Sequence, residues 1–330
     1  MVSATRWNLN DTSIRSNPGC PTRTGRNFWL TCVLAAVCAA PLSGQFRRPK
    51  PANVISDAAS FSAESRLVLL PVTVTDRNGK TVTGLRQEHF RISDESAAST
   101  IVSFGRTETP VSLGIVFDLS SSMGRKLPVA LEVARAVINS LGTGDAGYLI
   151  TFDKVPQVRV PYTYDVASLG RNLLFSPAHG NTALYDAVKL GLDHGRKGGE
   201  ARKALIVISD GGDNRSRLME SQLIAAALEA DTQIYSIAVH ERLRPEDEVP
   251  GAAFMDRLAK STGGLLFDVR QTGEIPAMAE RLAQAMREQY LIGFKPPEHG
   301  LRNTWRKVRV KVDVPGTSLY VSTKSAYYHQ

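Results

Sequence analysis

Five residues with carboxylate or hydroxyl side chains lie in predicted loops. Four of them follow apolar, strand-like runs, and the fifth precedes a helix-like stretch. Two of these runs, Val111–Phe117 and Ala204–Ile208, lead into loops that carry an aspartate. Ligands of an open parallel sheet bind beyond the carboxyl ends of its strands, so such loops are where a site is expected. The five candidate residues are Asp118, Ser120, Ser122, Thr182 and Asp210.

All five side chains are hard oxygen donors, which favours magnesium, manganese or calcium over zinc or copper. Magnesium takes about six oxygen ligands and usually keeps some waters. We expect the hydroxyls of Ser120, Ser122 and Thr182 to bind the ion directly, while Asp118 and Asp210 act mainly through bound water. A cation held mostly by neutral groups stays electron-poor. An open coordination position on it would attract a carboxylate from another protein.

These residues and their neighbours also have ordinary structural interpretations. Ser120 and Ser122 would suit the cap of the helix that follows. Metal coordination is favoured because capping alone requires no matching residues on two distant loops. Asp186 falls in the first turn of a helix, where an acid compensates the helix dipole. His179 and Asp213 are expected to be loop residues rather than ligands.

Two enzymatic interpretations are weaker. Gly142-x-Gly144-x-x-Gly147 has the glycine spacing of a dinucleotide-binding loop, which requires a strand before it and a helix after it. Here a helix comes first, so we expect a helix end and a tight turn. A magnesium-dependent phosphoryl-transfer enzyme would typically need a second nearby carboxylate, and position 120 holds serine. No nucleophile elbow or Walker-type loop occurs, so no enzymatic activity is expected.

Residues 109–289 alternate apolar strands with helices, which predicts an α/β fold with a doubly wound, mostly parallel sheet covered on both faces. Strands are expected at Ser112–Phe117, Gly147–Phe152, Val158–Val160, Ala204–Ser209, Gln233–Val239 and Leu265–Val269. Helices are expected at Leu127–Leu141, Ala183–Gly195, Ser221–Ala230, Ala253–Lys260 and Ile275–Tyr290.

Residues 63–108 and 290–330 flank this region and have β character, with short strand-like runs and alternation of valines with charged residues from Val308 to Val314. Residues 63–108 offer too few strands to bury both faces by themselves. We expect the two flanks to form one small all-β domain around the inserted α/β domain. The charged residues of the alternating run are expected to form the solvated face of a strand.

Residues 1–44 are typical of a secretory signal peptide, because Arg26 precedes the apolar run Phe28–Ala40 and small, turn-forming residues follow. The run is shorter than the roughly 20 residues that span a bilayer, so we expect no membrane span in the mature chain. A retained anchor is the alternative. Residues 45–62 are expected to be a flexible linker. The protein is therefore expected to be exported to the periplasm, the cell envelope or the medium.

Composition agrees with export and argues against a role in nucleic-acid binding. Removing the signal peptide would leave no thiol, because it holds all three cysteines, Cys20, Cys32 and Cys38. It would also remove four basic residues and one acid, lowering the formal net charge from +8 to +5. That excess is modest and no basic run is interleaved with aromatic residues, so a nucleic-acid partner is not expected.

Asp118-x-Ser120-x-Ser122, followed by Thr182 and by Asp210 before a glycine, resembles the metal-ion-dependent adhesion site of von Willebrand factor type A domains. All five positions occur in the family's order. The flanking segments "VTVTDRNGKTVTGLRQEHFRI" and "YLIGFKPP" with "VRVKVDV" resemble the acidobacterial von Willebrand factor A-related family of exported proteins. The resemblance extends from about position 66 to the end of the sequence.

This resemblance implies an exported protein-interaction or adhesion module with a doubly wound fold. It implies a site that binds a partner's Asp or Glu carboxylate through Mg²⁺ or Mn²⁺, and no enzymatic role. A structural envelope scaffold with a stabilising metal site is the alternative, and a Mg-dependent phosphoryl-transfer enzyme is less favoured. In related adhesion domains the last helix can shift when the metal gains a ligand, and here that helix would be residues 275–290.

Overall fold

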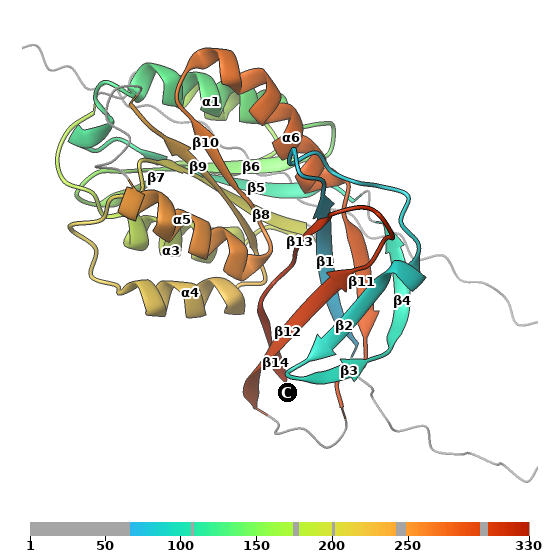
Figure 1. Cartoon of the computed structure of the whole chain (residues 1–330). Helices are drawn as coiled ribbons and strands as arrows, with labels where there is room; N and C mark the ends of the chain where they lie inside the picture. Colours follow the sequence, from blue (N-terminus) through green and yellow to red (C-terminus); the bar gives the residue numbers. More distant parts are fainter. Residues whose placement is uncertain are drawn as a thin grey trace, which may run out of the picture. The chain divides into compact units, whose positions relative to one another are not determined.

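The computed structural model describes residues 67–106, 109–173, 178–199, 202–241, 249–297 and 303–329. The expected signal peptide, the expected linker and all three cysteines lie outside these residues. The described chain forms a six-stranded sheet flanked by helices and two four-stranded sheets (Figure 1). No helix within the described ranges is long and apolar enough to cross a membrane.

The six-stranded sheet carries the candidate residues. In order across the sheet, its strands are β10 (Leu266–Val269), β9 (Gln233–Val239), β8 (Arg202–Ser209), β5 (Val111–Asp118), β6 (Ala146–Phe152) and β7 (Pro156–Thr163). All neighbours are parallel except β7, which is antiparallel to β6. The chain runs outward from β5 to β7 and then returns to β8 on the other side of β5. The carboxyl ends of β5 and β8 therefore meet at a topological switch point.

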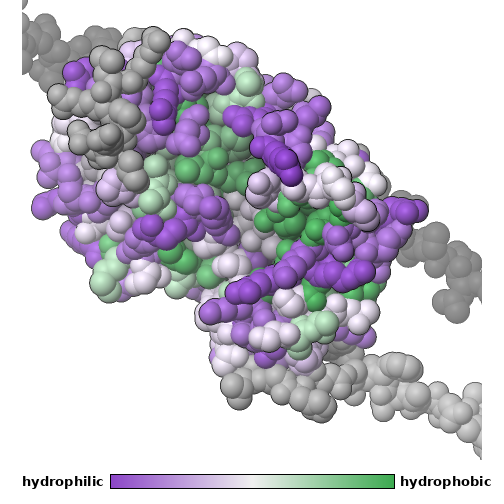
Figure 2. Space-filling view, viewed as in Figure 1, coloured by the Kyte–Doolittle hydropathy of each residue, from purple (hydrophilic) through white to green (hydrophobic). Residues whose placement is uncertain are grey.

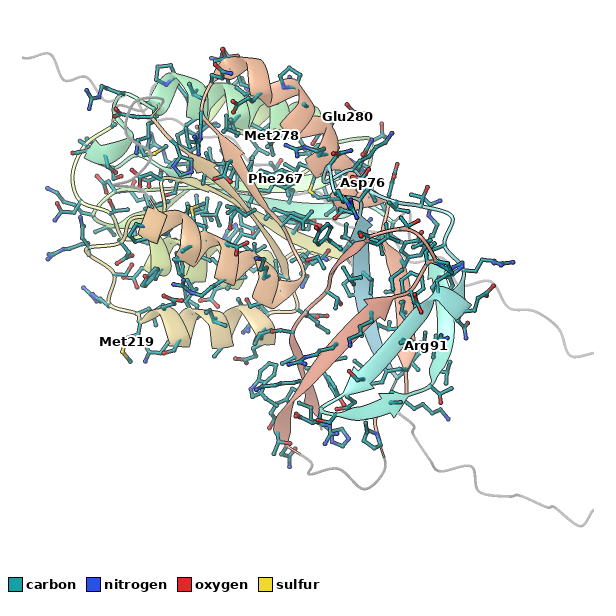
Figure 3. The ribbon with its side chains drawn as sticks, viewed as in Figure 1. Asp76, Arg91, Met219, Phe267, Met278 and Glu280 are labelled. Atoms are coloured by element: carbon teal, nitrogen blue, oxygen red, sulfur yellow. The ribbon has the colours of Figure 1, made fainter. Side chains whose placement is uncertain are left out.

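Helices cover both faces of this sheet, and each face has its own apolar core. One face packs on α1 (Leu127–Asn139), α2 (Ala167–Leu173) and α6 (Ile275–Arg287). The other packs on α3 (Leu184–Gly195), α4 (Glu220–Glu229) and α5 (Val249–Thr262) (Figure 1). Phe267 of β10 and Met278 of α6 both belong to the first core (Figure 3). β5 is buried along its whole length, as a strand covered on both faces must be.

The two four-stranded sheets combine strands from both flanks and face each other across a third apolar core. One sheet has the order β13 (Tyr320–Ser322), β1 (Val68–Thr75), β11 (Tyr290–Phe294) and β4 (Ile101–Arg106). The other has the order β14 (Ala326–His329), β12 (Thr304–Val312), β2 (Phe90–Asp94) and β3 (Ala97–Ser99). We call this pair the β sandwich. Arg91, Arg309 and Lys311 are exposed on the outer face of β2 and β12, within a hydrophilic stripe (Figure 2).

The predicted fold class, a doubly wound α/β sheet inserted in an all-β unit formed by both flanks, is confirmed. The last helix is shorter than predicted. α6 ends at Arg287, and Tyr290 begins β11, so the predicted helix Ile275–Tyr290 was wrong at its end. The Tyr290 ring lies against Phe90 and Phe104, with ring centroids 5.0 and 5.7 Å apart. This contact with distant strands outweighs the helical apolar pattern.

Two other elements depart from the sequence analysis. β7 spans Pro156–Thr163 rather than the predicted Val158–Val160, and α2 was not predicted. β7 is an edge strand with mostly exposed side chains, so it lacks the apolar pattern of a buried strand. α2 has only 7 residues, too few for a clear helical period. Around Gly142-x-Gly144-x-x-Gly147, the predicted order of helix and then strand is confirmed, with α1 before it and β6 after it.

Candidate metal-binding site

Asp118 is the last residue of β5, and its carboxylate is fully buried. One oxygen accepts a hydrogen bond from the Ser120 backbone N–H at 2.8 Å, and the other accepts one from the Ser209 hydroxyl at 2.5 Å. Burial, partly offset by these hydrogen bonds, raises the pKa of Asp118 to about 6. The sequence analysis did not single out Ser209, which lies at the end of the neighbouring strand β8.

The two candidate serines lie beside each other, with their hydroxyl oxygens 3.0 Å apart. Ser120 is buried, whereas Ser122 is exposed, so the pair reaches from the interior to the surface. Hydrogen bonding by the Ser122 hydroxyl also lowers the pKa of Asp210. The Ser120 side chain caps neither η2 (Ser121–Met123) nor α1, whose N-terminal cap position is Lys126. The capping interpretation of Ser120 is therefore wrong.

Thr182 is buried directly before α3 and joins two loops through its backbone. Its N–H donates to the Asn214 side-chain oxygen at 2.9 Å. Its carbonyl accepts from the backbone N–H groups of Asn214 and Arg215, both at 3.0 Å. Residues 179–180 of the same loop exchange backbone hydrogen bonds of 2.7 and 3.1 Å with residues 119–121. Backbone contacts thus hold together the three loops that carry Asp118, Thr182 and Asp210, which we call the candidate loops.

Asp210 forms a buried ion pair with Lys126, at 2.8 Å between Oδ2 and Nζ. Both side chains are at most 8% exposed. Burial by itself raises the pKa of Asp210, but the hydrogen bond and charge of Lys126 outweigh it and hold the pKa below its usual value. Lys126 was not among the residues predicted from the sequence. The sequence did contain a signal for this residue. Lys126 stands at the start of a helix, where a cation opposes the helix dipole and needs a compensating partner.

Three other polar residues near the site have structural roles. The Asp186 carboxylate accepts hydrogen bonds from the backbone N–H groups of Arg217 and Leu218 at 3.1–3.2 Å. Asp213 accepts one from the Tyr185 N–H at 3.0 Å. His179 is exposed, and its ring pairs with Asp153. These contacts brace the loops, and that none of the three is a ligand stays a prediction.

The donor set at the switch point fits a hard divalent cation, because it consists of hydroxyl and carboxylate oxygens from three loops. Only Asp118 and Asp210 contribute carboxylates. Across the described parts of the chain, no three histidine, cysteine, aspartate or glutamate side chains come together to hold a metal ion. A cation here would depend on the hydroxyls of Ser120, Ser122 and Thr182, and it would share Asp210 with the Lys126 ammonium.

Residues 113–212 match the family model of the von Willebrand factor type A domain. All five candidate residues lie within this range. A relative in Borreliella burgdorferi, an uncharacterized protein, is 24% identical over 212 residues, which cover 60% of this chain. The alignment spans 61% of that relative's length.

Several solved structures are similar to this chain. A von Willebrand factor type A protein from Catenulispora acidiphila is 14% identical, with a TM-score of 0.46 over 82% of this chain and 76% of that one. The conserved hypothetical protein BatB from Bacteroides thetaiotaomicron is 18% identical, with a TM-score of 0.42 over 53% and 98%. The vWF domain of the type V pili tip protein Mfa5 from Porphyromonas gingivalis is 13% identical, with a TM-score of 0.41 over 54% and 95%.

Proposed function

Because the chain contains a von Willebrand factor type A domain over residues 113–212, we propose that it is an interaction or adhesion module that binds a partner protein. The proposed contact is a divalent cation that bridges the candidate site to an Asp or Glu carboxylate of the partner. One observation carries this proposal. The loops that hold Asp118, Thr182 and Asp210 come together at the switch point between β5 and β8, and they supply hydroxyl and carboxylate donors there. Ser122 is exposed there, so the site opens toward a partner.

The proposed cofactor is Mg²⁺ or Mn²⁺, which when bound supplies an electron-poor centre for an oxygen anion. In this proposal the hydroxyls of Ser120, Ser122 and Thr182 would bind the ion directly, and Asp118 and Asp210 would act mainly through water. Ser209 orients the buried Asp118 carboxylate. Lys126 keeps Asp210 ionised and in place. The neutral hydroxyls leave the positive charge of the centre available to a carboxylate.

Export is part of the proposal and rests on the signal-peptide pattern of residues 1–44. The mature protein would act in the periplasm, in the cell envelope or outside the cell. We propose no enzymatic activity, because position 120 holds serine where a magnesium-dependent phosphoryl-transfer enzyme would typically need a second carboxylate.

One observation favours a structural scaffold as the second candidate. Lys126 neutralises Asp210 within the site, so the loops are electrostatically satisfied without a cation. In a scaffold, a cation would add stability but would not contact a partner. Partner binding would then be indifferent to a chelator.

The test is capture of a partner from cell-envelope and culture fractions by the immobilised protein, with Mg²⁺ and with chelator. The variant is Ser122→Ala, because this exposed hydroxyl can be removed without leaving a buried cavity. Ser121→Ala is the matched control, since Ser121 is an exposed serine of the same loop outside the candidate set. We expect capture by the parent and the control only with Mg²⁺, and at least roughly tenfold less capture by Ser122→Ala. Capture that survives both chelator and Ser122→Ala contradicts the proposal and supports the scaffold.

A further inference from the structure

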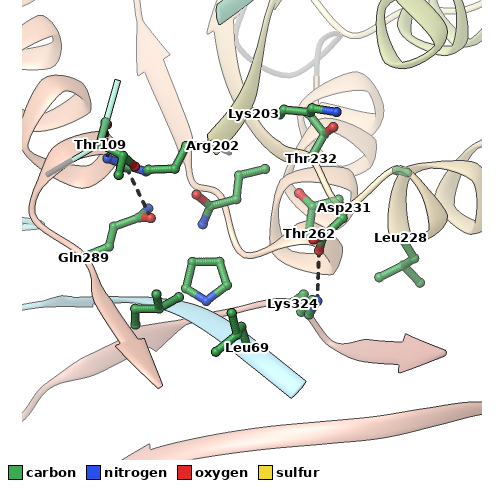
Figure 4. A pocket seen from close by; sticks show the side chains of 14 residues that line it. Leu69, Thr109, Arg202, Lys203, Leu228, Asp231, Thr232, Thr262, Gln289 and Lys324 are labelled. Atoms are coloured by element: carbon green, nitrogen blue, oxygen red, sulfur yellow. Dashed lines mark hydrogen bonds and ion pairs between the residues drawn. The ribbon is translucent and has the colours of Figure 1, made fainter. Parts of the chain in front are cut away.

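A pocket of about 270 Å³ lies at the end of the six-stranded sheet opposite to the candidate metal-binding site (Figure 4). Its lining includes Arg202 and Gln233, the first residues of β8 and β9. The candidate residue Asp210 follows the other end of β8, and Asp118 ends the parallel neighbour β5 on that same side of the sheet. The pocket is therefore separate from the site that carries the proposed function.

One wall of the pocket is the outer face of the β sandwich. Leu69 and Pro71 of β1 and Leu291 of β11 line it, while the alternate residues Leu70 and Val72 point into the sandwich core. Leu69 is 45% exposed. This wall offers apolar surface to a ligand.

The pocket also holds a cation for which the described residues provide no carboxylate partner. The Arg202 guanidinium donates to the Thr109 carbonyl at 3.3 Å and to the Gln289 side-chain oxygen at 3.5 Å, two neutral groups at long distance (Figure 4). No carboxylate of the described residues forms an ion pair with Arg202. The nearby Asp145 carboxylate is taken by Arg287 at 2.6 Å. Burial lowers the pKa of Arg202, as expected for a cation that is poorly compensated.

A buried polar network fixes the side chain that faces Arg202. Gln289 is 1% exposed. Its amide nitrogen donates to the Ala285 carbonyl, the Tyr235 hydroxyl and the Thr73 hydroxyl, at 2.8, 2.9 and 3.2 Å. The amide oxygen therefore points toward the guanidinium. Arg202 is held in place with donors to spare, because a guanidinium has five N–H groups.

A second, larger groove continues from this pocket. Leu69, Leu228, Asp231 and Lys324 line both, and the groove of about 860 Å³ extends to Trp305 and Tyr328. The Asp231 carboxylate is paired with Lys324 at 2.9 Å, so it does not neutralise Arg202 (Figure 4). A ligand with its head at Arg202 has apolar surface available along this groove.

We propose that the pocket binds an amphiphilic carboxylate, whose head pairs with Arg202 and whose apolar body packs on Leu69, Pro71 and Leu291. The planar guanidinium matches a carboxylate with two parallel hydrogen bonds. The ligand supplies a counter-charge to Arg202, because the Asp231 carboxylate that also lines the pocket is paired with Lys324. The apolar body covers the outer face of β1 and β11, where Leu69 is left exposed.

The experiment is calorimetric titration of the full chain with octanoate, 1-octanol and octylamine, in the presence of chelator so that the candidate metal-binding site plays no part. These probes share one apolar body and differ in the head. We expect octanoate to bind at least roughly tenfold more tightly than 1-octanol, because a charge-assisted hydrogen bond is lost, and octylamine to bind least. Arg202→Met should remove the preference for octanoate. Arg309→Met, an exposed arginine on the outer face of β12, should keep it.

Two results would overturn the proposal. One is octanoate binding no tighter than 1-octanol in the parent protein, and the other is an unchanged preference in Arg202→Met. If Arg202→Met fails to fold, Leu69→Glu replaces it, because this side chain is already half-exposed. The added carboxylate should abolish octanoate binding, and octanoate binding at parental strength in Leu69→Glu would equally refute the site.

Discussion

Lys126 and Asp210 form the ion pair that most distinguishes the candidate site, since both groups are buried and each is the other's counter-charge. Removing one partner of a buried pair is far more costly than removing an exposed one, because the remaining charge keeps no compensation. A divalent cation at the site would compensate Asp210 in place of the ammonium. Under the proposed function, the ion pair would therefore link the stability of the protein to metal binding.

We predict that Lys126→Met lowers the free energy of unfolding of the metal-free protein by about 3 kcal/mol. Mg²⁺ should raise the melting temperature of this variant by more than it raises that of the parent, because the cation replaces the lost charge. Thermal melts with chelator and with Mg²⁺ measure both effects. Lys154→Met, an exposed lysine nearby, is the control and should behave like the parent. Equal responses of variant and parent to Mg²⁺ would contradict the prediction.

Asp118 gives the stability of the protein a pH dependence opposite in sign to that of an acid whose pKa is lowered by folding. Its pKa is raised in the folded protein from 3.8 to about 6, so folding favours the protonated form. The stabilisation of the folded protein by protonated Asp118 is fully present below pH 3.8 and is lost as the pH rises through about 6. In the metal-free protein the loss is on the order of 3 kcal/mol.

The measurement compares the parent with Asp118→Asn, which keeps the shape of the protonated acid. Between about pH 4 and pH 7, the free energy of unfolding of the parent should fall relative to that of the variant by this amount. Denaturant titrations with chelator at several pH values give the difference. A constant difference across this range would show that Asp118 titrates normally.

Among the elements, β5 and β8 position the site, and both were predicted within two residues of their observed bounds. A buried parallel strand is a continuous apolar run, which is a strong local signal. β7 and the end of α6 were predicted poorly for the opposite reason. The edge strand β7 is mostly exposed, and α6 ends where the next residues pair with β1 and β4. Such pairing involves residues far away in the sequence.

The α6–β11 connection also bears on the predicted shift of the last helix. Arg287, in the last turn of α6, donates to the Asp145 carboxylate at 2.6 Å and to the Ser140 carbonyl at 3.0 Å. The Asp145 carboxylate also accepts from the Val111 and Gly142 N–H groups. A shift of α6 would have to break or carry along these contacts. The shift stays a prediction.

At the scale of the whole molecule, the α/β part and the β sandwich share buried contacts. Only two residues separate α6 from β11. One of them, Gln289, hydrogen-bonds both Tyr235 of the six-stranded sheet and Thr73 of the β sandwich. A buried polar group is costly to leave unpaired, so separating the two parts would expose or orphan this network.

We therefore predict that both parts unfold in a single cooperative transition. Far-UV circular dichroism follows the helices, and the fluorescence of Trp305 follows the β sandwich in a Trp7→Phe, Trp29→Phe background. The two probes should give the same denaturant midpoint. Gln289→Leu should lower that midpoint. Two well-separated midpoints in the parent would show that the shared contacts are too weak to couple the parts.

The sequence by itself determined the fold class and the five candidate residues, because apolar periodicity and motif spacing are local properties. Asp118 ends β5, Asp210 follows β8 and Thr182 precedes α3, and parallel strands bring such positions to one edge. Only the tertiary structure decided that Ser209 and Lys126 complete the site. Ser209 lies 91 positions from Asp118, and Lys126 lies 84 from Asp210. The Arg202 pocket likewise exists only where β1 and β11 lie beside the starts of β8 and β9, since burial and charge compensation depend on neighbours that are distant in the chain.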